Sequence, residues 1–139
     1  MHTEHLQNVR PSWVAFGWFV GAAVTAFLLL ALIATGLLDD SSGQANSGWV
    51  LVAMFIGFVA AGYLAGGRVG AAPILHAVGI GLFSLVVWFL ANLFLGEPLG
   101  ATTWSTSPTL GVGAVLLQIV AAAIGGRLGS REARAAATE

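Results

Sequence analysis

The sequence contains no cysteine and no lysine, and it is poor in charge of either sign. Without cysteine the chain forms no disulfide, offers no thiolate ligand to a metal and has no thiol nucleophile. Only 8% of the residues are charged, against about 25% in soluble domains, which excludes an ordinary soluble globular fold. The net charge of -1 leaves no basic face of the kind that binds nucleic acid, so we expect no nucleic-acid partner.

The sequence is instead rich in long apolar segments. Hydrophobic residues make up 58% of the 139 residues. They gather in four runs, at residues 13–38, 49–67, 74–96 and 109–128. A helix needs about 20 apolar residues to cross a bilayer, and only helices satisfy their own backbone groups in lipid. The sequence therefore predicts one all-α domain, an up-down-up-down bundle of four transmembrane helices with short polar tails.

The charged residues between the apolar runs predict the orientation of this bundle. Asp39, Asp40 and Glu97 fall in predicted loops on one side. Every basic residue falls on the other side, namely Arg10, Arg68, Arg127, Arg131 and Arg134. Because basic loops stay on the cytoplasmic side of a membrane, we expect a multi-pass inner-membrane protein with both termini in the cytoplasm.

A short glycine-rich motif occurs twice. Residues 66–70 read GGRVG and residues 125–129 read GGRLG, and each copy ends an apolar run. The pattern is typical of a tandem repeat of helical hairpins, and convergence on a useful helix end explains it nearly as well. Neither copy has the lysine or the preceding strand of a phosphate-binding loop, so nucleotide binding is not predicted.

Small residues recur at four-residue spacing on each predicted helix, which allows close backbone approach in lipid. We expect these ridges to pack the helices of the chain against one another, with docking of another subunit as the alternative. The second helix has two ridges and is expected at the centre of the assembly. The predicted packing residues are Gly17, Gly21, Ala53, Gly57, Ala61, Gly62, Ala65, Gly66, Gly81, Ala114, Gln118, Ala122 and Gly126.

Few polar side chains fall inside the predicted spans. Gln118 lies near mid-depth, where Ser84 or Thr25 could hydrogen-bond to it, and contact with a solute or ion is the alternative. His76 is expected at headgroup depth, within reach of water or phosphate, with proton transfer as the alternative. Trp18 is expected to face lipid or to pack. No set of residues suggests catalysis or metal binding, so we expect no enzyme activity, cofactor or metal.

The motif Gly67-Arg68, followed by Leu75-His76-Ala77 and Gly81-Leu82, resembles a class of small four-helix prokaryotic membrane proteins of unknown function. In that class a G-G-R turn ends the second helix, and Leu-His-Gly followed by Gly-Leu opens the third. Ala77 stands here in place of the usual glycine. The resemblance implies a four-helix membrane fold and its topology, but it implies no activity.

These observations predict a non-enzymatic protein of the lipid bilayer. We expect a structural or accessory subunit that acts through helix packing, with itself or with a larger membrane complex. A small oligomeric transporter or channel is the alternative. A transporter should gather polar residues at mid-depth, and this chain has few there, none of them ionisable.

Overall fold

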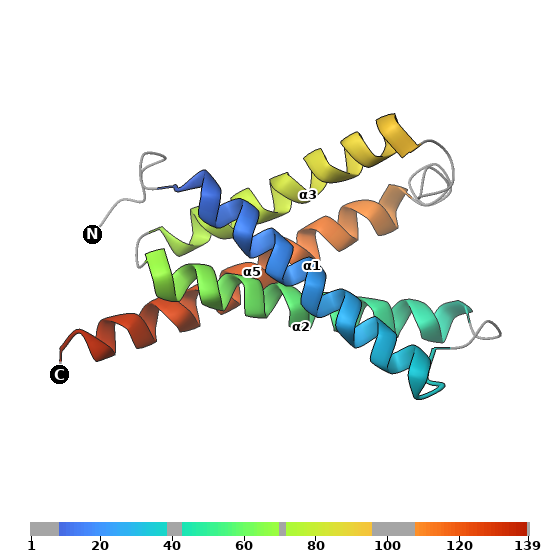
Figure 1. Ribbon diagram of the computed structural model, residues 1–139, viewed down its shortest axis with the longest axis horizontal. Coiled ribbons are helices and arrows are strands. Elements are labelled where there is room, and N and C mark those ends of the chain that lie inside the picture. The colour runs from blue at the N-terminus through green and yellow to red at the C-terminus, as the bar shows by residue number, and fades with distance from the viewer. Residues whose placement is uncertain (1–8, 39–42, 70–71, 96–107, 139) are drawn as a thin grey trace.

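The computed structural model describes residues 9–38, 43–69, 72–95 and 108–138, and all regular structure in these ranges is helical (Figure 1). The helices are α1 (Pro11–Ala34), α2 (Gly43–Val69), α3 (Pro73–Leu95) and α5 (Pro108–Ala136). Helices α1, α2 and α5 are long and apolar enough to cross a membrane. Helix α3 is also apolar over Pro73–Val87. The all-α prediction is confirmed for the described residues.

Helix α1 ends at Ala34, although the apolar run continues to Leu38. Gly36 has a φ of 72°, and its N–H donates to the Ile33 carbonyl at 3.0 Å. The N–H of Leu37 donates to the Leu32 carbonyl, also at 3.0 Å. These two bonds form a Schellman cap, which satisfies the last carbonyls and requires a residue that tolerates a left-handed backbone. The helix therefore ends where glycine allows the cap, before hydrophobicity ends.

Two helices extend beyond the apolar runs that predicted them. Helix α2 begins at Gly43, inside the polar stretch that we expected to be a loop. Helix α5 continues to Ala136, through the charged segment that we expected to be a tail. That segment, SREARAA, is rich in alanine, arginine and glutamate, which favour helix wherever they face solvent. Hydropathy therefore predicts only the apolar part of a helix, whereas the helix propensity of the flanking residues determines how far the helix extends beyond it.

Helices α2 and α5 form the most extensive interface of the fold. Gly62 faces Ala122, and one turn later Gly66 faces Gly126. Residue numbers increase together along the contact, so α2 and α5 run in the same direction. The two segments that end in the repeated motif thus lie side by side.

Helices α1 and α3 pack on this central pair in the opposite direction. In α1, Gly21 lies beside Ala61 of α2, and Thr25 lies beside the earlier Gly57. Helix α3 meets α5 in the same way, with Gly81 against Ile119 near the middle and Pro73 against Gly126. Figure 1 shows that α1 and α3 begin, and α2 and α5 end, toward one end of the molecule.

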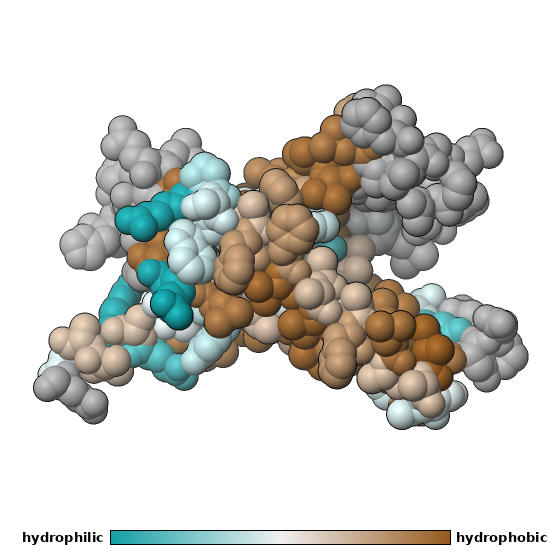
Figure 2. Space-filling view, viewed as in Figure 1, coloured by the Kyte–Doolittle hydropathy of each residue, from teal (hydrophilic) through white to brown (hydrophobic). Residues whose placement is uncertain are grey.

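The buried core is small and lies where the helices cross. Its residues are Val14, Phe58, Ala77, Ile80, Ala121 and Ala122. Bulky apolar side chains instead cover much of the outside, as the brown surface of Figure 2 shows. Phe27 is 70% exposed and Leu30 is 65% exposed. In water such a surface would be an aggregation hazard, whereas lipid tails solvate it as well as a protein core would.

Candidate functional site

A chain of hydrogen bonds joins one side chain from each of the four helices. Trp18 of α1 donates its indole N–H to the Ser84 hydroxyl of α3 at 2.7 Å. Ser84 donates to the Gln118 side-chain carbonyl of α5, and the Gln118 amide donates to the Met54 sulfur of α2 at 3.4 Å. We call these four residues the interhelical polar chain. It fixes the depth at which the four helices meet.

The sequence pointed to Ser84 or Thr25 as the partner of Gln118, and the structure pairs Gln118 with Ser84. Thr25 donates to the Gly21 carbonyl of its own helix at 2.7 Å instead. The sequence did not predict the hydrogen bond from Trp18 to Ser84. The Trp18 ring also packs edge-on against Phe83, with centroids 5.6 Å apart. An indole N–H that is partly buried needs an acceptor. This need for an acceptor could have predicted a hydrogen bond from Trp18 to a polar side chain such as Ser84.

The contact between α2 and α5 depends on glycines of the repeated motif. A methyl group on Gly125 would lie 2.8 Å from the Tyr63 backbone nitrogen, and one on Gly66 would lie 2.7 Å from the Gly126 Cα. Both separations are below any van der Waals contact, so only glycine allows the backbones to come this close. We call this contact the glycine seam, formed by Gly62, Gly66, Gly125 and Gly129. Gly125 and Gly129 were not among the predicted packing residues, although the second motif copy marks them.

Most of the predicted packing residues lie against another helix of the same chain. Those that are buried are Gly17, Gly21, Ala53, Gly57, Ala61, Gly62, Ala65, Gly66, Gly81, Ala122 and Gly126. Ala114 and Gln118 are half-buried. Helix α5 of the same chain occupies the ridge of Gly62 and Gly66, so this ridge is not available to another subunit. The four-residue spacing of small residues predicted two packing faces on α2, but it did not predict which helix packs on each face.

His76 lies in the first turn of α3 and is only 2% exposed. Its Nε2 accepts the backbone N–H of Arg10 at 3.2 Å, and its Nδ1 lies 2.9 Å from the Ala72 carbonyl. Because Nε2 accepts, this pair of contacts assigns the donor role to Nδ1. The expectation that its side chain reaches water or phosphate is therefore wrong. His76 ties the start of α1 to the start of α3.

The arginines gather at the end of the molecule where α1 and α3 begin. The backbone of Arg10 contacts His76, Arg68 is in the last turn of α2, and Arg127 follows the glycine that touches Pro73. Figure 2 shows the hydrophilic residues concentrated at this end. We call it the arginine end; Arg10, Arg68, Arg127, Arg131 and Arg134 are all exposed there. Asp39, Asp40 and Glu97, the acidic residues expected in loops on the other side, lie outside the described residues.

Comparisons of the chain with protein-family models, with curated proteins and with solved structures found no match. The part of the chain that the structure describes holds no group of three or more histidine, aspartate or glutamate residues that could bind a metal. The function must therefore be argued from the interhelical polar chain, the glycine seam and the arginine end.

Proposed function

We propose that the chain is an inner-membrane protein whose four helices cross up-down-up-down, with both termini in the cytoplasm. Its three long apolar helices and the bulky residues on its outside support insertion in a bilayer. The exposed arginines at one end support the orientation, because a positively charged end stays in the cytoplasm.

Within the membrane we propose a structural or accessory role. The observation that carries this proposal is the interhelical polar chain, in which Trp18, Ser84 and Gln118 bond to one another across helices. A path for solutes needs polar groups that are free to exchange partners with the solute. In the described residues, every buried side-chain nitrogen or oxygen already has a hydrogen-bond partner. The buried polar groups of the described residues thus hydrogen-bond within the protein and support the packing of its helices.

A partner would meet the outer face of α5. With the small ridges occupied inside the chain, α5 presents a regular exposed row of bulky residues at four-residue spacing, Val112, Leu116, Val120, Ile124 and Leu128. Such a row can interdigitate with another membrane helix, and ridges at this spacing are the usual contacts between packed helices. We propose that this row is where the chain joins a further subunit, its own copy or a different one.

The test compares complex size in mild detergent for three forms of the protein. The wild type should stay in carbonate-washed membranes and elute as a species larger than one chain. Replacing Leu116 and Ile124 together by alanine should reduce it to one chain, because both side chains are exposed and contribute only to an outside contact. Leu30→Ala, an exposed change on α1, is the control. A single-chain species that moves solutes into liposomes would contradict the proposal and support the transporter alternative.

A further inference from the structure

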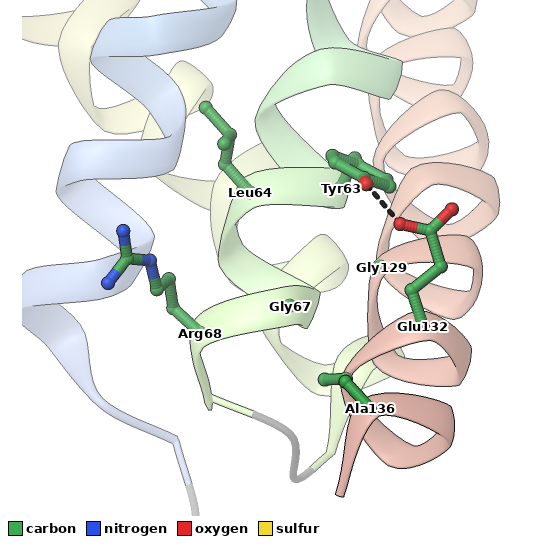
Figure 3. Close-up of a pocket in the computed structure, with 8 residues that line it drawn as sticks. Tyr63, Leu64, Gly67, Arg68, Gly129, Glu132 and Ala136 are labelled. Carbon is green, nitrogen blue, oxygen red and sulfur yellow. Dashed lines mark hydrogen bonds between the residues drawn. The ribbon is translucent and has the colours of Figure 1, made fainter. Parts of the chain in front are cut away.

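A groove runs between α2 and α5 at the arginine end. Its volume is about 320 Å³. Figure 3 shows Leu64 and Arg68 on the α2 side of the groove, with Tyr63 and Glu132 toward α5. The lining residues are Tyr63, Leu64, Gly67, Arg68, Gly129, Glu132, Ala133 and Ala136. The groove exists because glycine and alanine line its floor, where larger side chains would fill it.

Glycine at position 67 is not required by the packing of the helices. A methyl group there would have its nearest neighbour, the Gly129 carbonyl oxygen, at 3.6 Å, which is an ordinary contact. Gly129 differs, because its own methyl group would lie 2.8 Å from the Gly67 nitrogen. Close packing in the glycine seam thus explains why residue 129 is glycine, but it does not explain why residue 67 is glycine. Because it has no side chain, Gly67 leaves the groove that it lines unfilled at this point.

Among its lining residues the groove has one cationic side chain, Arg68, and one acidic side chain, Glu132. Arg68 makes no hydrogen bond or ion pair with any described residue. Glu132, the one acidic residue of the described ranges, is held by the Tyr63 hydroxyl, which donates to its carboxylate on the far side of the groove (Figure 3). Further exposed arginines, Arg127, Arg131 and Arg134, follow along α5. Arg68 thus offers the one guanidinium among the residues that line the groove.

We propose that the groove binds an anionic glycerophospholipid, with one acyl chain along Leu64 and Gly67 and the phosphate at Arg68. This inference rests on the proposed membrane location, which places the arginine end at the headgroups of the cytoplasmic leaflet. A guanidinium fork matches the geometry of a phosphate, and basic pockets on this side of a membrane bind anionic headgroups.

The test measures binding of phosphatidylglycerol and phosphatidylcholine with identical acyl chains to the full-length protein in detergent, by lipid retention in native mass spectrometry. The wild type should prefer phosphatidylglycerol by about fivefold or more, the effect of roughly one arginine near an anionic headgroup. Arg68→Gln should abolish this preference. Gly67→Leu should weaken binding of both lipids by filling the groove, whereas Gly67→Ala tests that the site tolerates a methyl group without loss of fold.

Arg134→Gln is the matched control, because Arg134 is exposed at the same end but does not line the groove. It should keep most of the preference. Equal binding of the two lipids by the wild type, a preference that survives Arg68→Gln, or an equal loss in Arg134→Gln would each overturn the inference. Glycerol 3-phosphate should not displace the lipid; if it does, the site recognises soluble phosphate and the lipid assignment is wrong. Arg68→Gln alters an exposed side chain, so it decides the question even if Gly67→Leu aggregates.

The two proposals fail separately. A chain that stays in carbonate-washed membranes but shows no lipid preference loses only the groove assignment. A chain that carbonate releases loses the proposed membrane location, and the lipid site falls with it.

Discussion

At the scale of single residues, the structure depends on a few polar side chains that find partners on other helices. In lipid such a group has no water to return to, so its bond to a neighbouring helix determines where that neighbour lies. Gln118 can satisfy its carbonyl and amide at once only because Ser84 and Met54 lie on different helices at the same depth. His76 acts in the same way at the arginine end, between Arg10 and Ala72.

Gln118→Leu should lower the free energy of unfolding by about 0.6–2 kcal/mol, the range for hydrogen bonds between membrane helices. Combined with Ser84→Ala in a double-mutant cycle, it should show a coupling energy of about 0.6 kcal/mol or more, because the two side chains share one bond. Equilibrium unfolding in a denaturing detergent measures both. Thr25→Val is the control and should cost less, since the Thr25 hydroxyl bonds within its own helix. Strict additivity of the two changes would contradict the interhelical polar chain.

His76→Phe should release the start of α1 from α3. The Arg10 amide would lose its acceptor, and a hydrogen bond of this kind contributes about 1 kcal/mol. Hydrogen exchange at that amide should therefore become about fivefold faster. His76→Gln keeps a carbonyl oxygen that can reach the Arg10 amide, and it should restore part of the protection. If the amide exchanges equally fast in the wild type and in His76→Phe, the bond between Arg10 and His76 does not hold α1.

At the scale of the elements, close approach of backbones replaces the hydrophobic drive that packs helices in water. Burying apolar side chains gains little when the alternative solvent is lipid, so dispersion contacts at short range carry the association. Glycine permits the shortest range of all, and the glycine seam places it at successive turns of both α2 and α5. The remaining helices then cover this pair.

Gly125→Ala should destabilise the bundle although it adds a single methyl group. That methyl would lie 2.8 Å from the Tyr63 nitrogen, so α2 and α5 must separate, and overpacking of this kind costs about 1–3 kcal/mol. Gly113→Ala, on the same helix, is the matched control because nothing lies within 4 Å of the added methyl. It should be neutral or slightly stabilising, since alanine favours helix over glycine by up to about 1 kcal/mol. Thermal unfolding in detergent compares them, and equal midpoints would show that the seam does not determine stability.

At the scale of the whole molecule, the distribution of charge supports the proposed orientation. The described ranges carry all the arginines at one end and bulky apolar residues along the sides. A chain with this distribution lowers its free energy by crossing the bilayer and keeping the arginine end in the cytoplasm. In the proposed orientation, the charged last turns of α5 extend past the membrane surface into the cytoplasm.

Single cysteines introduced at Ala135 and Ser42 should label from opposite sides. The chain has no cysteine of its own, and Ala135 is exposed in the last turns of α5. An impermeant maleimide added to intact cells should modify the cysteine at position 42, and it should modify the one at position 135 only after lysis. Ser130 is a poor choice for the inner label because it is only 4% exposed. Labelling of both sites in intact cells would contradict the cytoplasmic placement of the C-terminus.

The sequence by itself determined the all-α class, the approximate helices and the placement of every arginine at or beyond the ends of the apolar runs, because hydropathy and charge are properties of a segment and need no neighbour. Helix ends followed local rules that hydropathy alone does not capture, as Gly36 shows. Only the tertiary structure decided that the ridge of Gly62 and Gly66 meets α5, that Trp18 completes the interhelical polar chain, and that His76 is buried. Periodicity identifies which face of a helix packs, and several helices carry a similar small-residue face. The pairing of these faces depends on the tertiary arrangement, which must bring the backbones into contact and also provide hydrogen-bond partners for the buried polar groups.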